Sequence, residues 1–414
     1  MRTLAKLSLT SWIFIGLFAG VAAGALFGES IVPVAEPLAE VFIRLLRMTI
    51  MPLILTSIMT GVLSIGSGKG LGRLGFKTFL YYTISSMLAI LTGQILVNIF
   101  RPGSGADIGL QGDVTEIAAA EQSIKDLLYR IIPTNVFESL ATADVLPVIF
   151  FSILFGYFIL RIKEPYRSHL SNFIEGAFRV MMKMVHFVIW FAPIGVFGIN
   201  AKIMGTTGLE GFKSLGFYFA IVLIGLFIHV FVTLPTLLRF VGRVNPVKHY
   251  KGMIPAALTA FSTSSSMATL PINLDCVTTR SRVSEKIASF TLPIGATVNM
   301  DGTALYECVA AIFIAQVYGI DLTFGQQIIV VLTALLASIG AAAVPMAGLV
   351  MMSIILQAVG LPLEGVGIIL AVDRILDMFR TTTNVISDSC GAVIIARSEG
   401  ETLERMGEPA EEID

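Results

Sequence analysis

The sequence has little charge for its length. Only 14% of its 414 residues are Asp, Glu, Lys or Arg, whereas 55% are hydrophobic, and the mean hydropathy is +0.84. Because a soluble globular domain carries about 25% charged residues, this composition predicts a polytopic membrane protein in contact with a lipid bilayer. The net charge of −1 gives no electrostatic attraction to nucleic acid, which we therefore exclude as a partner.

Cysteine and histidine are also scarce. The three cysteines are an odd number without paired spacing, which predicts neither a disulfide framework nor a zinc site. The four histidines are scattered, and the sequence contains no HExxH motif and no phosphate-binding Gly-Lys loop. We therefore expect neither an enzyme nor an organic cofactor.

Long apolar runs supply the predicted fold. About twenty apolar residues cross a bilayer, and we expect eight such transmembrane helices at 11–32, 39–65, 76–100, 145–160, 173–199, 217–240, 289–317 and 369–396. The first run could also be a signal peptide, but its length and the spans that follow favour a retained helix.

The distribution of charge between these runs predicts the orientation of the chain. Basic loops alternate with an acidic segment at 101–142. Because cytoplasmic loops carry the excess of Lys and Arg, we expect both termini in the cytoplasm. The chain is thus predicted to be a multi-pass protein of the cell (inner) membrane.

Two further apolar segments are too short to span. The first, 253–261, leads into the serine-rich stretch 262–271, and the second, 328–336, leads into 338–348 and an apolar return at 349–359. Each pattern predicts a re-entrant helical hairpin with a small-residue tip, because non-helical backbone at membrane depth needs protein or water around it. Such repeated interruptions mark transporter substrate sites. The alternative for the serine-rich stretch is an ordinary surface loop.

The last span carries a stripe of polar side chains. At about 100° of rotation per residue, an arc of roughly 100° contains Asp373, Asp377, Arg380, Asn384 and Asp388. Four charged residues facing lipid would cost on the order of 10 kcal/mol. The stripe therefore predicts a polar site for a charged ligand, and the alternative is an ion-pair network that only joins helices.

The span before it contains the sequence Asn-Met-Asp-Gly-Thr at 299–303. A carboxylate and a glycine at mid-membrane predict an unwound turn. Unwound carbonyls together with Asp and Asn oxygens are hard ligands that suit a small hard cation such as Na⁺.

Together these motifs resemble the glutamate transporter family, the dicarboxylate/amino acid:cation symporters. The serine-rich tip, NMDGT, the SIG…VP…AG tip and DxxxDMxRTxxNVxxD occur in the family's order, over essentially the whole chain and most specifically at 251–396. The resemblance implies a homotrimer with inverted repeats and an elevator mechanism. It implies a scaffold at 1–75 and 101–212, a transport domain at 76–100 and 213–400, and a cytoplasmic tail at 401–414.

The resemblance also implies the substrate site. Arg380 matches the residue that binds the substrate's side-chain carboxylate, and Asp377 matches the one that holds its amino group. Arg374 and Asp373 are accessory residues. Further substrate contacts are implied at Ser264, Ser265, Ser266, Thr303, Val344, Gly348, Thr381 and Asn384.

Three sodium sites are implied in the same way. The first combines Asp388 with Gly295, Asn299 and Asn384. The second takes its ligands from Thr297, Met300, Ser338, Ile339 and Ala341. The third takes its ligands from Tyr82, Ser85, Ser86, Asn299 and Asp301.

The sequence departs from the family pattern near these sites. Ser387 stands where glycine usually precedes the last Asp, and Ser264 and Met378 stand where many members carry an arginine. In this interpretation Arg374, one turn from Met378, takes over the arginine's role.

The leading hypothesis is a prokaryotic-type symporter that takes up L-aspartate or L-glutamate with Na⁺. The alternative is a proton-coupled or weakly Na⁺-dependent transporter of the same family, with Asp373, Asp377 or Glu307 as proton carrier. A channel and an intramembrane enzyme are disfavoured, because the tips argue for occlusion and the serines lack a base.

Overall fold

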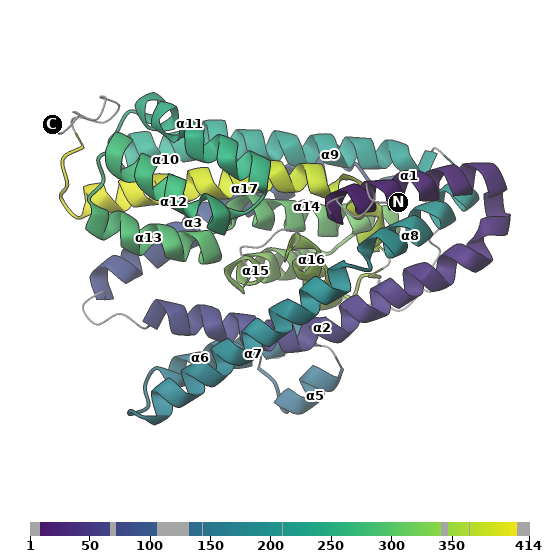
Figure 1. Cartoon of the computed structure of the whole chain (residues 1–414), viewed down its shortest axis with the longest axis horizontal. Helices are drawn as coiled ribbons and strands as arrows, with labels where there is room; N and C mark the ends of the chain where they lie inside the picture. Colours follow the sequence, from purple (N-terminus) through teal and green to yellow (C-terminus); the bar gives the residue numbers. More distant parts are fainter. Residues whose placement is uncertain are drawn as a thin grey trace, which may run out of the picture.

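The structure is a computed structural model that describes residues 9–66, 72–105, 132–142, 144–208, 210–340, 347–363 and 365–403. Within these ranges every regular element is a helix (Figure 1). Four described stretches are long and apolar enough to cross a membrane, namely Ser11–Leu45, Arg73–Phe100, Ser214–Phe240 and Glu285–Val317.

The first two helices meet at a short 3₁₀ turn. α1 (Leu9–Phe27) leads through η2 (Gly28–Ile31) into α2 (Val32–Gly66). The expected second span therefore begins earlier than residue 39, and the polar segment around Glu36 lies inside a helix. Glu36 forms an ion pair with Lys202, whose Nζ lies 2.7 Å from Glu36 Oε1.

Glycines let α1 pack directly on the backbone of α8 (Ala192–Thr207). A Cβ atom at Gly16, Gly20 or Gly24 would lie only 2.2, 2.5 or 2.7 Å from a backbone oxygen of α8. Such small-residue stripes allow close approach between membrane helices. The two helices therefore meet backbone to backbone.

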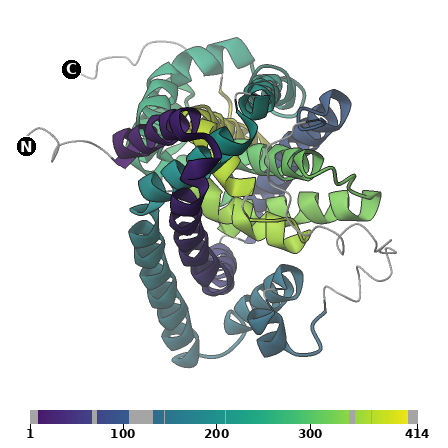
Figure 2. The same ribbon diagram turned by 90° about the vertical axis from the view of Figure 1, so that its right-hand side faces the viewer.

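The expected fifth span is wrong as a single helix. The structure has α7 (Tyr166–Ile189) and α8, with a break at Trp190 and Phe191. Pro193, in the first turn of α8, has no N–H to continue the ladder of α7. α2 packs against α6 (Val145–Ile159), α7 and α8, and Figure 2 shows α7 at the edge of the molecule.

A π turn interrupts the expected sixth span. α9 (Glu210–Ile228) continues through η3 (His229–Thr233) into α10 (Leu234–Phe240). The extra residue in the turn changes the register of the helix. His229 in this turn is fully buried.

The chain breaks where the small-residue tips and the unwound turn are predicted. α11 (Pro246–Thr263) ends at Ser264, whose backbone is left-handed with φ 49°, and α12 (Ser266–Asp275) begins after Ser265. α13 (Glu285–Val298) and α14 (Asp301–Val317) are separated by Asn299 and Met300. α15 (Phe324–Gly340) and α16 (Ala347–Ala358) flank the second tip.

The last helix, α17 (Gly365–Ser398), is the centre of the C-terminal half. It contacts α9, α11, α13, α14 and α16, and in Figure 1 it runs as a yellow ribbon among them. α3 (Gly72–Phe100) packs against α14, α9 and α17. This packing surrounds the polar stripe of α17 with protein.

Candidate functional site

The polar stripe of α17 faces the protein interior, as its spacing predicts. Asp373, Arg380 and Asp388 are each only 1% exposed, whereas Ile375 on the opposite face is 40% exposed. Asp377, Thr381 and Asn384 are also buried. The charged groups therefore meet protein rather than lipid.

Arg380 is the centre of the first part of this stripe, from Asp373 to Arg380. Its Nη2 lies 2.9 Å from Asp377 Oδ1 and 3.0 Å from Asp373 Oδ1. Its guanidinium carbon lies 3.8 Å from the centre of the Tyr306 ring, at cation–π distance. Arg374 reaches the second oxygen of Asp377 at 3.4 Å. Two arginines thus hold one carboxylate.

One side of the guanidinium remains available to an acceptor. Arg380 Nε and Nη1 donate no hydrogen bond to any described residue. A Cβ at Gly348, at the start of α16, would lie 2.9 Å from Nη1, so a larger residue there would require the guanidinium to shift. Buried donors of this kind usually meet a partner, and an ionised carboxylate is a strong acceptor for guanidinium N–H groups.

Asn384 connects α17 to the unwound turn. Its Oδ1 accepts a hydrogen bond from the backbone N–H of Gly302 at 2.7 Å, and its Nδ2 donates to Thr303 Oγ1 at 3.2 Å. A Cβ at Gly302 would lie 2.7 Å from the backbone oxygen of Arg380. Glycine here lets α14 start directly against the backbone of α17 at Arg380.

The serine tip also lies beside α17. The ring of Phe261, at the end of α11, meets the ring of Phe379 edge to face at 5.1 Å. Ser264 is buried, and its hydroxyl has no hydrogen-bond partner among the described residues. Ser265 begins α12 by accepting the N–H of Ala268 at 3.2 Å. Ser266 is buried as well.

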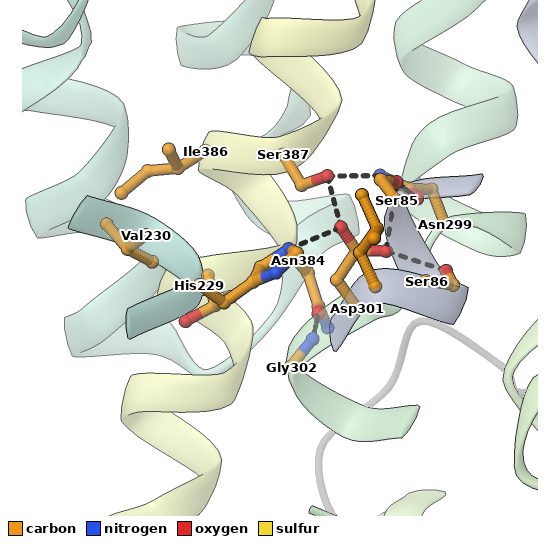
Figure 3. A network of polar contacts seen from close by, with 12 residues as sticks. Ser85, Ser86, His229, Val230, Asn299, Asp301, Gly302, Asn384, Ile386 and Ser387 are labelled. Atoms are coloured by element: carbon orange, nitrogen blue, oxygen red, sulfur yellow. Dashed lines mark hydrogen bonds and ion pairs between the residues drawn. The ribbon is translucent and has the colours of Figure 1, made fainter. Parts of the chain in front are cut away.

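Asp301 collects four donors at the start of α14 (Figure 3). Ser86 and Ser85 donate to its Oδ1 at 2.6 and 3.2 Å. Ser387 donates to its Oδ2 at 2.6 Å, and His229 Nε2 lies 2.9 Å from the same oxygen. All are fully or almost fully buried. The structure thus joins helices α3, α14 and α17 at one carboxylate.

Asn299 links this cluster to Asp388. Its Nδ2 donates to Asp388 Oδ1 at 2.8 Å, while its Oδ1 lies 3.2 Å from the Ser85 hydroxyl, whose one proton it shares with Asp301. A Cβ at Gly295 would lie 2.6 Å from both Asp388 Oδ1 and the Tyr82 hydroxyl. Tyr82 donates to the backbone oxygen of Thr291 at 2.8 Å and lies beside Asp388.

The implied second sodium site is described only in part. Thr297 donates to Ile294 O at 3.0 Å, Met300 is buried, and α13 packs against α15. Ser338 is buried and donates to Leu335 O at 2.8 Å. Ile339 lies in the last turn of α15. Ala341, and Val344 of the substrate set, lie outside the described residues.

Two residues of these polar clusters, His229 and Tyr306, are not predicted by the sequence analysis. His229 contacts Asp301, whereas the sequence shows it only as one of four scattered histidines. The sequence feature that indicates a role for His229 is its position inside an apolar span, where ionisable side chains are functional candidates by default. Tyr306 was missed because an aromatic residue in a membrane helix has no distinctive spacing.

The potential metal ligands around Asp301 and Asp388 are mainly oxygens, with the ring nitrogen of His229 also beside Asp301. Among the described residues, no three His, Cys, Asp or Glu side chains converge as a transition-metal site requires. Hydroxyl, amide and carboxylate oxygens suit hard cations. This donor set fits a small hard cation at Asp301 and at Asp388.

In the part of the chain that the structure describes, these features define a helical membrane protein with a buried polar site. Residues 9–398 match the model of the sodium:dicarboxylate symporter family, and the chain belongs to that family.

Similar proteins cover nearly the whole chain. It is 37% identical to a proton/sodium-glutamate symport protein of Bacillus subtilis (strain 168), over 95% of this chain and 94% of that protein. It is 35% identical to the protein of the same name from Bacillus caldotenax, with 97% of each chain covered. The mouse (Mus musculus) excitatory amino acid transporter 3 is 37% identical over 88% of this chain and 79% of that protein. These names describe transporters, consistent with a chain that is not an enzyme.

Proposed function

We propose that the chain is a secondary active symporter that takes up L-aspartate or L-glutamate together with Na⁺. The observation that carries the proposal is the buried guanidinium of Arg380, which lies beside the carboxylate of Asp377. Two of its nitrogens, Nε and Nη1, donate to no described residue. The similar proteins named for glutamate symport support the substrate class.

The geometry suits an acidic amino acid. Nη2 of Arg380 is held by Asp373 and Asp377, which leaves the N–H groups of Nη1 and Nε as donors for the side-chain carboxylate of the substrate. Asp377 supplies a negative charge for the substrate's ammonium group. We assign Ser264, Thr303, Thr381 and Asn384, which are all buried, as further contacts of the substrate.

Sodium would be held by the oxygen clusters at Asp301 and Asp388. Ser85, Ser86 and Asn299 supply neutral oxygens beside the Asp301 carboxylate. Asn299 belongs to both clusters, because its amide also bonds to Asp388. Sites that share a ligand influence each other's occupancy. If Na⁺ tightens the binding of the substrate, the substrate must tighten the binding of Na⁺ by the same factor.

We further propose the architecture that this mechanism requires. Eight helices span the inner membrane with both termini in the cytoplasm, and α11–α12 and α15–α16 form the two re-entrant hairpins. α3 and α9–α17 form the transport domain, and their mutual packing supports this division. α1, α2 and α6–α8 form the scaffold of a homotrimer in which the transport domain moves as an elevator.

A proton-coupled transporter is the second candidate. Glu307 is fully buried, and neither of its carboxylate oxygens has a hydrogen-bond partner among the described residues. A neutral carboxylic acid tolerates such surroundings better than a carboxylate does. The names of the Bacillus relatives include both ions.

The test of the substrate is an Arg380→Ala variant. Removing one partner of a buried charge interaction costs about 3–5 kcal/mol, so L-aspartate affinity should fall by at least two orders of magnitude. Arg179, an exposed arginine paired with Glu175 on α7, provides the control substitution Arg179→Ala. Aspartate binding that survives Arg380→Ala unchanged would show that the site assignment is wrong.

The coupling ion is tested by titrating L-aspartate binding with and without Na⁺ at two pH values. Affinity that rises by orders of magnitude with Na⁺ supports the symport with sodium. Affinity that ignores Na⁺ but falls as the pH rises supports the proton-coupled candidate. Affinity that responds to neither ion refutes both coupling schemes.

A further inference from the structure

The hydroxyl of Ser387 behaves differently from its neighbours on α17. Thr382, Thr383 and Ser389 each donate to a backbone oxygen of their own helix, at 2.8, 2.9 and 2.7 Å. Such local bonds are the usual solution for hydroxyls inside helices. Ser387 Oγ instead donates across to Asp301 Oδ2 at 2.6 Å (Figure 3).

Ser387 fixes the orientation of the Asp301 carboxylate. Its hydroxyl and the His229 ring both hold Oδ2, at 2.6 and 2.9 Å. With Oδ2 held from that side, Oδ1 faces the hydroxyls of Ser85 and Ser86. The carboxylate therefore cannot rotate away from the oxygens that would share a cation with it.

The same hydroxyl also orients the amide of Asn299. Asn299 Nδ2 donates to Ser387 Oγ at 3.1 Å and to Asp388 Oδ1 at 2.8 Å. Reversing this amide would place its oxygen against the Asp388 carboxylate and against a hydroxyl that already donates elsewhere. The amide oxygen is thus held toward Ser85, where a hard cation needs it.

We propose that Ser387 is a positioning residue for sodium binding at Asp301. It acts through the two ligands that it orients, Asp301 and Asn299, and it connects them to Asp388 through the same amide. Groups that orient the ligands of a metal ion typically change its affinity by 10–100-fold when they are removed. The proposal rests on the sodium coupling proposed above and names a residue that sets its strength.

The experiment is a sodium titration of the purified Ser387→Ala protein. Sodium binding is measured without amino acid, as the rise in unfolding temperature when Na⁺ replaces choline, and again as the dependence of L-aspartate affinity on Na⁺. We expect the half-saturating Na⁺ concentration to rise about 10–100-fold. L-aspartate affinity at saturating Na⁺ should stay within about threefold of the wild type, a difference of under 1 kcal/mol.

Ser389→Ala is the matched control. It removes a buried hydroxyl from the same helix, one that bonds to Ile386 O and to His249 rather than to Asp301. Its sodium titration should match that of the wild type. Ser387→Gly, which also lacks the hydroxyl, should repeat the shift of Ser387→Ala and provides a second fold-competent test.

The outcomes separate this proposal from the proposed function. A wild-type sodium titration in Ser387→Ala or Ser387→Gly overturns the positioning role, and so does an equal shift in Ser389→Ala, because the effect would then come from packing. If the wild type itself does not respond to Na⁺, the proposed sodium coupling fails and this proposal fails with it. The Arg380→Ala result still judges the substrate assignment separately.

Discussion

Replacing Tyr306 with leucine should weaken acidic-substrate binding without removing any charged group. The Tyr306 ring lies 3.8 Å from the Arg380 guanidinium carbon, and both side chains are fully or almost fully buried. A cation–π contact away from water contributes about 2 kcal/mol. At 1.4 kcal/mol per factor of ten, Tyr306→Leu should lower L-aspartate affinity by up to roughly 30-fold.

The matched control keeps the ring. Tyr306→Phe removes only the hydroxyl and retains the aromatic face that contacts Arg380. Calorimetric titration of the purified proteins at saturating Na⁺ measures the affinities. The explanation is refuted if Tyr306→Leu binds like the wild type, or if Tyr306→Phe loses as much affinity as Tyr306→Leu.

Two further predictions concern stability. In Gly302→Ala the new Cβ meets Arg380 backbone at 2.7 Å, and we expect overpacking to lower the unfolding free energy by about 1–3 kcal/mol; Gly176→Ala on α7, with no atom within 4 Å of the new Cβ, should show no such loss. At the end of α17, hydrogen bonds from Lys77 and Arg73 lower the pKa of Glu399 below its ordinary value of 4.5. Because the folded pKa is the lower one, the stabilisation is present above pH 4.5 and is lost as the pH falls through the folded value. The unfolding temperature of Glu399→Gln should therefore lie below that of the wild type at pH 7 and approach it in acid; a constant difference across that range would contradict the assigned cause.

Much of the site on α17 was predictable because it depends on one helix. The 3.6-residue period alone places Asp373, Asp377, Arg380 and Asp388 on one face, and the cost of charge in lipid turns that face inward. The breaks at Ser264 and at Asn299–Met300 were also predicted, since short apolar segments and a mid-membrane glycine announce them. The polar face and the two breaks each depend on a short segment of sequence, so the pattern of residues within that segment predicts them.

Features that depend on contacts between distant segments were not predictable from the pattern. His229 reaches Asp301 because a π turn and the packing of α9 against α14 and α17 bring it there. The break between α7 and α8 was missed because apolar residues continue across Trp190 and Phe191, so only Pro193 marked it. Hydropathy measures how apolar a segment is, and it carries no information on where its hydrogen-bond ladder stops.

The enclosure of α14 has a consequence for how the protein is made. The stretch Glu285–Val317 is the least hydropathic of the four long ones, at 1.3, and its apolar window is 100% buried, whereas Ser214–Phe240 has a hydropathy of 2.5 and is 44% buried. Asp301 and Glu307 on α14 are fully buried, because neighbouring helices cover them. A segment of this kind gains little by entering lipid alone. We therefore expect its stable insertion to depend on α3 and α9, which precede it in the chain, and on α17, which follows it.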